Sequence, residues 1–128
     1  MTVQIAHLFA TGCVAIIFFQ IALIAGAPLG EFTQGGQVKG ALPARGRLIA
    51  AISIPILLFC GAAIVSVAGF PGLDWPRRTG WIALVVMTIS AILNWITPSK
   101  KERAVWGPIM LVMAGLAAHV MIATAGDT

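Results

Sequence analysis

Two histidines have a spacing that could support cofactor chemistry. His7 and His119 lie near the far ends of the first and last long apolar stretches. With a helical rise of about 1.5 Å per residue, both would lie about 6–8 Å from the same end of a helix bundle. A pair of neutral imidazoles on neighbouring helices could ligate haem or a metal. We favour the plainer interpretation, a bond from each ring to a backbone carbonyl or water, because no carboxylate or thiolate supports a ligand pair at that level.

Other groups with catalytic chemistry are sparse. The chain has four acidic residues, and none of them lies within a long apolar stretch. It has no Ser-His-Asp, H-E-x-x-H or paired-carboxylate arrangement. Cys13 and Cys60 are not part of a C-x-x-C redox motif. We therefore expect a non-enzymatic protein with no metal site and no cofactor, haem being the alternative.

The segment after the first apolar stretch has the composition of a binding loop. Gly35-Gly36 predicts a two-residue hairpin turn, because a type I′ turn needs positive φ at both positions. Glycine N–H groups near Lys and Arg side chains could bind an anion, although no nucleotide-binding motif is present. We favour a tight turn held by an ion pair between Glu31 and a neighbouring arginine, with the other basic residues on lipid headgroups. The candidate partner or ligand surface comprises Glu31, Gly35, Gly36, Lys39, Arg45, Arg47, Glu102 and Arg103.

Four apolar stretches must position these residues. The chain of 128 residues is 59% hydrophobic and 9% charged, which excludes a soluble domain and intrinsic disorder. We predict spans at about 3–27, 48–69, 79–96 and 104–124, since about 20 helical residues cross a bilayer. Backbone in lipid must be helical. The fold class is therefore all-α: a single domain of four transmembrane helices in an antiparallel bundle, with a short hairpin-like loop after the first helix.

The positive charges predict an orientation. Six of the eight Lys and Arg residues follow the first or the third span, and only Arg77 and Arg78 follow the second. The positive-inside rule therefore places both termini outside and the first and third loops in the cytoplasm. Because all these charges lie between apolar runs, the net charge of +4 indicates contact with lipid headgroups and not with nucleic acid.

The sequence also predicts where the last helix begins. Ser99-Lys100-Lys101-Glu102 fits the S-x-x-E capping box, which predicts that the helix begins at Ser99. A lone two-stranded hairpin is marginally stable in water. We therefore expect the first loop to dock on the third and form one cytoplasmic cap, with an ion pair from Glu31 to one of the nearby cations.

Several of these residues occur in a familiar order. The chain resembles an uncharacterised family of small four-helix bacterial integral membrane proteins, over most of its length. The resemblance implies the four-helix fold and a bacterial inner-membrane location, and it implies no activity. The residues that carry it are Gly26-Ala27-Pro28-Leu29-Gly30, Gly35-Gly36, Gly40, Leu42-Pro43, Arg47, Asn94, Ser99, Glu102-Arg103 and Pro108.

Together these features favour a membrane protein that acts by association. The first hypothesis is an accessory subunit or small binding module of a membrane complex, with other membrane subunits or further copies of the chain as partners. The second is a small oligomeric channel or carrier, although the spans have few polar groups to line a pore. The third is a haem- or quinone-linked redox protein that uses His7 and His119.

Overall fold

The computed structural model describes residues 1–127 and is helical throughout its regular elements. Each of the four long helices is long and apolar enough to cross a membrane, by length and composition. Three short 3-10 turns complete the described part of the chain. The elements are α1 (Thr2–Ile24), η1 (Gly30–Phe32), η2 (Gln34–Gly36), α2 (Ala44–Val67), α3 (Arg77–Ile96), α4 (Lys100–Ala123) and η3 (Ala125–Asp127).

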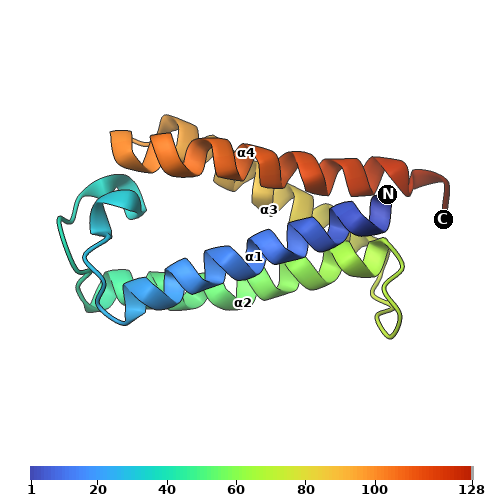
Figure 1. The fold of residues 1–128 in the computed structure, drawn as a ribbon, viewed down its shortest axis with the longest axis horizontal. Coiled ribbons are helices and arrows are strands. Elements are labelled where there is room, and N and C mark those ends of the chain that lie inside the picture. The colour runs from blue at the N-terminus through green and yellow to red at the C-terminus, as the bar shows by residue number, and fades with distance from the viewer. Residues whose placement is uncertain (128) are drawn as a thin grey trace.

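The four helices pack as two pairs. Helix α1 packs most extensively on α2, and α3 on α4, while the α2–α3 and α1–α4 contacts join the pairs. Figure 1 shows both chain ends at one end of the bundle and the α1–α2 connection at the other. We call that connection, residues 25–43, loop 1. Fully buried side chains of all four helices, including Phe9, Ile64, Met87 and Met121, form a continuous core.

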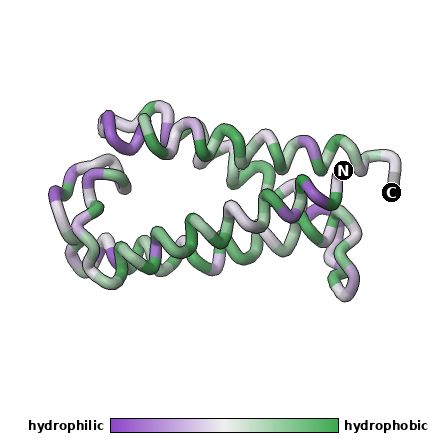
Figure 2. Tube along the Cα trace, viewed as in Figure 1, coloured by the Kyte–Doolittle hydropathy of each residue, from purple (hydrophilic) through white to green (hydrophobic). Residues whose placement is uncertain are grey.

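The outward faces of the helices are as apolar as the core. Large exposed side chains such as Phe18, Leu58 and Ile122 occur on different helices. In Figure 2 hydrophobic residues follow the helices, whereas many hydrophilic residues gather at the end formed by loop 1 and the start of α4. A contiguous exposed apolar surface of this kind indicates a multi-pass membrane protein.

The prediction of a hairpin in loop 1 is wrong. Gly35 and Gly36 do have positive φ, +81° and +69°, as a two-residue turn would require. The surrounding backbone nevertheless forms the turns η1 and η2, and no strand occurs among residues 1–127. The physical reason is that loop 1 bonds to the start of α4, so its polar backbone groups are satisfied without a partner strand.

The four predicted spans are found as helices, and α2 begins a full turn before its predicted span. Helix α2 begins at Ala44, directly after Pro43, and not near residue 48. Proline is favourable just before a helix because its fixed φ suits the first turn. The earlier start places Arg45 and Arg47 on the first turn of α2 instead of in a loop.

Candidate functional site

Loop 1 is held in shape by its own backbone and by the first turn of α2. The Gly30 N–H donates to the carbonyl of Gly40 (2.9 Å), and the Arg47 Nε donates to the carbonyl of Leu42 (2.8 Å). A Cβ on Gly30 would lie 2.5 Å from the carbonyl oxygen of Val38, so only glycine fits there. Leu42 is buried with residues of α1 and α2 in a small second core. Loop 1 is therefore an ordered structural unit.

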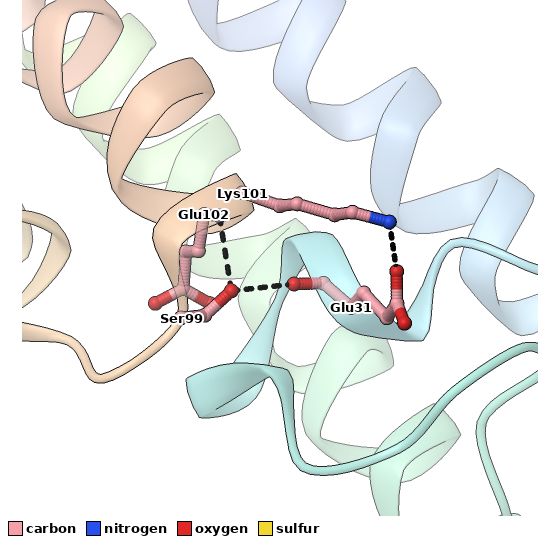
Figure 3. A network of polar contacts seen from close by, with 4 residues as sticks. All are labelled: Glu31, Ser99, Lys101 and Glu102. Carbon is pink, nitrogen blue, oxygen red and sulfur yellow. Dashed lines mark hydrogen bonds and ion pairs between the residues drawn. The ribbon is translucent and has the colours of Figure 1, made fainter.

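Ser99 joins loop 1 to α4. Its hydroxyl donates to the carbonyl of Glu31 (2.8 Å) and accepts from the N–H of Glu102 (3.1 Å) (Figure 3). The second bond is the N-cap that the capping-box sequence predicted, and α4 begins at the next residue. One hydroxyl therefore caps the helix and fastens the loop, which confirms that loop 1 docks on the start of the last helix.

An ion pair lies on the outer side of the same junction. Lys101 Nζ pairs with the carboxylate of Glu31 and lies 5.6 Å from the centre of the Phe32 ring. The predicted ion pair of Glu31 is thus present, with a lysine of α4 in place of a neighbouring arginine. The hydrogen bond and then the charge of Lys101 lower the pKa of the Glu31 carboxyl, and Lys39 adds to the effect. Because this pair lies at the surface, with 58% of the Lys101 side chain exposed, it contributes little to stability.

Glu102 occupies the inner side of the junction. It is the third residue of α4, and its side chain does not close the capping box: its carboxylate accepts the N–H of Gly35 from loop 1 (3.2 Å). Only 7% of Glu102 is exposed, and it forms no ion pair within residues 1–127. The anion that the glycine-rich turn binds is therefore the carboxylate of Glu102.

A cavity of about 670 Å³ lies between loop 1 and the four helices. This volume is within the range of small-molecule sites, about 300–1,000 Å³. Phe32, Thr33, Gln34 and Gly35 close it at the loop-1 end, and Glu102 lies in its wall. The same docking contacts that hold loop 1 on α4 thus close one end of this cavity.

The polar groups of the cavity lie toward its loop-1 end, among apolar residues such as Leu93 and Ile96, and its far end is lined by apolar side chains alone. On α1, α2 and α3 a polar lining residue lies about one turn nearer to loop 1 than a buried apolar one, and on α4 the amphipathic Trp106 has that position. The pairs are Gln20 and Ile16 on α1, Ser53 and Leu57 on α2, Ser90 and Met87 on α3, and Trp106 and Met110 on α4. Asn94 and Thr97 add polar groups at the loop-1 end. The lining therefore matches a molecule with a polar head and an apolar body.

Trp106 has an unsatisfied donor in this wall. Its Nε1 is buried and has no hydrogen-bond partner, the only side-chain nitrogen or oxygen found in that state within residues 1–127. Its ring packs edge-on against Phe19 at 4.7 Å between centroids. Buried indole N–H groups normally find an acceptor, so this unpaired donor is an unusual feature of the α4 side of the site.

The open side of the cavity lies between α2 and α3. Ile56 on α2 and Leu93 on α3 line it, and they are 44% and 56% exposed. The lining residues of α1 and α4 are buried or half-buried. A molecule would therefore reach the cavity laterally, from the surface that the apolar faces of α2 and α3 present.

The structure brings together only some of the residues chosen from the sequence. Glu31, Gly35, Gly36 and Glu102 meet at the loop-1–α4 junction. Arg47 stabilises loop 1 from within. The remaining three cations, Lys39, Arg45 and Arg103, form no ion pair in the part of the chain that is described.

The two histidines are placed at the other end of the bundle. The Nδ1 of His7 bonds to the carbonyl of Val3 on its own helix (2.8 Å), and its ring lies 5.8 Å from that of Phe70. His119 is half-buried on α4. No hydrogen bond or ring contact joins the two histidines in the described chain, and no group of three potential metal ligands occurs there. The ligand pair of His7 and His119 therefore stays a prediction.

Several residues of the cavity carry no signal in the sequence. Ser53, Ser90 and Trp106 are single polar or aromatic residues in apolar helices, and nothing in their spacing relates one helix to another. Their common level appears only when the helices are packed.

No family model, curated protein or solved structure matches this chain. The resemblance to small bacterial membrane proteins therefore stays a prediction. Function follows here from the geometry and chemistry of the site itself.

Proposed function

We propose that this protein is a non-enzymatic binding module of a membrane, and that it holds a small molecule with a polar head and an apolar body in the cavity beneath loop 1. The observation that carries the proposal is a cavity whose far end is lined by apolar residues alone and whose polar lining residues, from all four helices and loop 1, lie toward the loop-1 end. Sites for small molecules combine apolar walls with a few convergent polar groups, which is the composition found here.

The proposed setting is the bacterial cytoplasmic membrane, by resemblance and by the apolar length of the helices. In this setting the helices cross the bilayer as an antiparallel bundle, and loop 1 and the start of α4 face the cytoplasm. The exposed cations Lys39, Arg45 and Lys100 then give this end a positive surface for lipid headgroups or for a further subunit of a membrane complex.

The orientation is tested with single cysteines in a background where Cys13 and Cys60 are replaced by alanine. Lys39 and Asp74 are both exposed, and they lie in loop 1 and in the α2–α3 connection. A membrane-impermeant maleimide should label Asp74→Cys in intact cells and label Lys39→Cys only after permeabilisation. The reverse labelling pattern would contradict the proposed orientation.

Ligand binding is tested by filling the cavity. Ser90 lies in the cavity wall on α3, whereas Thr88 is exposed on the same helix and outside the wall. We expect mass spectrometry of the protein purified in mild detergent to detect a bound small molecule, which Ser90→Phe should reduce at least about tenfold and Thr88→Phe should leave unchanged. Equal amounts of bound molecule in the two variants would count against the proposed site.

A further inference from the structure

The cavity beneath loop 1 has one formal charge in its wall. Glu102 is the only residue with an ionisable side chain among those that line the cavity, and no lysine, arginine or histidine lines it. Glu102 is buried and forms no ion pair within residues 1–127. Buried charges in proteins are ordinarily paired, so a carboxylate of this kind beside a cavity requires an explanation.

The surrounding backbone stabilises a negative charge on the Glu102 carboxylate. As the third residue of α4, Glu102 lies near the positive end of the helix dipole. The Gly35 N–H donates to one of its oxygens, at 3.2 Å. Helix and loop therefore stabilise the anion without a cationic side chain, and they leave its charge available to a molecule in the cavity.

The two lysines that precede Glu102 in α4 form no ion pair with it. Lys101 pairs with Glu31 on the outer side of the junction, and Lys100 is exposed. Charges that face water are screened within about 10 Å at ordinary ionic strength, whereas a buried carboxylate is screened much less. A molecule that arrives from between α2 and α3 meets the carboxylate and not these lysines.

Aromatic rings complete the environment of the polar end. Phe32 from loop 1 and Trp106 from α4 both line the cavity. The faces of such rings attract cations, and more strongly where water is excluded. Because the Phe32 ring already has Lys101 Nζ 5.6 Å from its centre, the buried carboxylate is the group that favours a positively charged ligand over a neutral or negative one.

We infer that the ligand of this cavity is a lipophilic cation, whose positively charged head lies against Glu102 and whose apolar body extends toward Ile16, Leu57 and Met110. The inference rests on the proposed function and adds the sign of the ligand charge. Glu102 acts as a binding residue and the loop-1 junction as the element that holds its carboxylate in place.

The test compares two single-chain probes of opposite charge, decyltrimethylammonium and decanesulfonate. Equilibrium dialysis measures their binding to the protein in nanodiscs of zwitterionic lipid, with empty nanodiscs subtracted. We expect saturable binding of decyltrimethylammonium alone. Glu102→Gln, which keeps an acceptor for the Gly35 N–H, should weaken that binding at least about tenfold, because a desolvated charge pair is lost.

The matched control is Glu31→Gln, which removes the other carboxylate of the same junction. Glu31 is outside the cavity wall, so its loss should leave the affinity for the cation unchanged. Equal binding of the cation by wild type and Glu102→Gln, saturable binding of the sulfonate, or no saturable binding of either probe would each overturn the inference. The two-probe comparison on wild type needs no variant, so it remains decisive if Glu102→Gln does not fold.

The outcomes also separate this inference from the proposed function. If the co-purified molecule disappears in Ser90→Phe but carries no positive charge, the binding function stands and the assignment of charge is wrong. If nothing co-purifies and neither probe binds, both are wrong.

Discussion

Replacing Gly36 with alanine should detach loop 1 from α4. Gly36 has φ +69°, and a Cβ built there would lie 2.6 Å from the Cβ and Oγ of Ser99. The left-handed conformation costs an alanine about 1–2 kcal/mol. Overpacking against Ser99 adds about 1–3 kcal/mol. We expect the amides of loop 1 to lose protection from hydrogen exchange, and the melting temperature in detergent to fall.

Gly40 provides the matched control. Its φ is +86°, but a Cβ there would have no atom within 4 Å. Gly40→Ala should therefore lose only the conformational part, about 1 kcal/mol. Equal destabilisation by Gly36→Ala and Gly40→Ala would show that contact with Ser99 is not what restricts Gly36.

Arg77→Ala should destabilise the opposite end of the bundle by about 2 kcal/mol. Each hydrogen bond from a charged donor contributes about 1.5–3 kcal/mol, and water can replace some of the bonds that the variant loses. The guanidinium of Arg77, at the start of α3, donates to the carbonyl (3.2 Å) and hydroxyl (2.8 Å) of Thr124. It also donates to the carbonyl of Met121. A cation at the end of α4 satisfies free carbonyls and opposes the negative end of the helix dipole.

Arg78→Ala is the control that distinguishes the loss of these hydrogen bonds from the loss of one positive charge. It is adjacent, carries the same charge and is exposed. Arg78→Ala should leave the melting temperature nearly unchanged, while Arg77→Ala should also increase hydrogen exchange in the last turn of α4. If the two variants lose the same stability, the net charge of that end matters and the specific bonds of Arg77 do not.

The sequence by itself determined the features that depend on neighbours along the chain. Each span is recognisable because about 20 consecutive apolar residues have one stable form in lipid. The N-cap at Ser99 was predictable because it joins residues three apart. Positive φ at Gly35 and Gly36 was predictable for the same local reason, and the docking of loop 1 followed from the order of the helices.

Only the tertiary structure determined which partners the side chains of the site contact. The hairpin prediction failed because loop 1 forms hydrogen bonds with α4 instead of within a hairpin. Gly35 and Glu102, which share one of these bonds, are 67 residues apart in the sequence. Glu102 fits the capping box in sequence, yet its carboxylate crosses to loop 1. Arg77 reads as an ordinary loop cation, yet it caps α4. The cavity forms where lining residues of four separate helices lie at the same depth in the bundle. Packing between the helices sets this depth, and the sequence pattern of one helix does not depend on that of another.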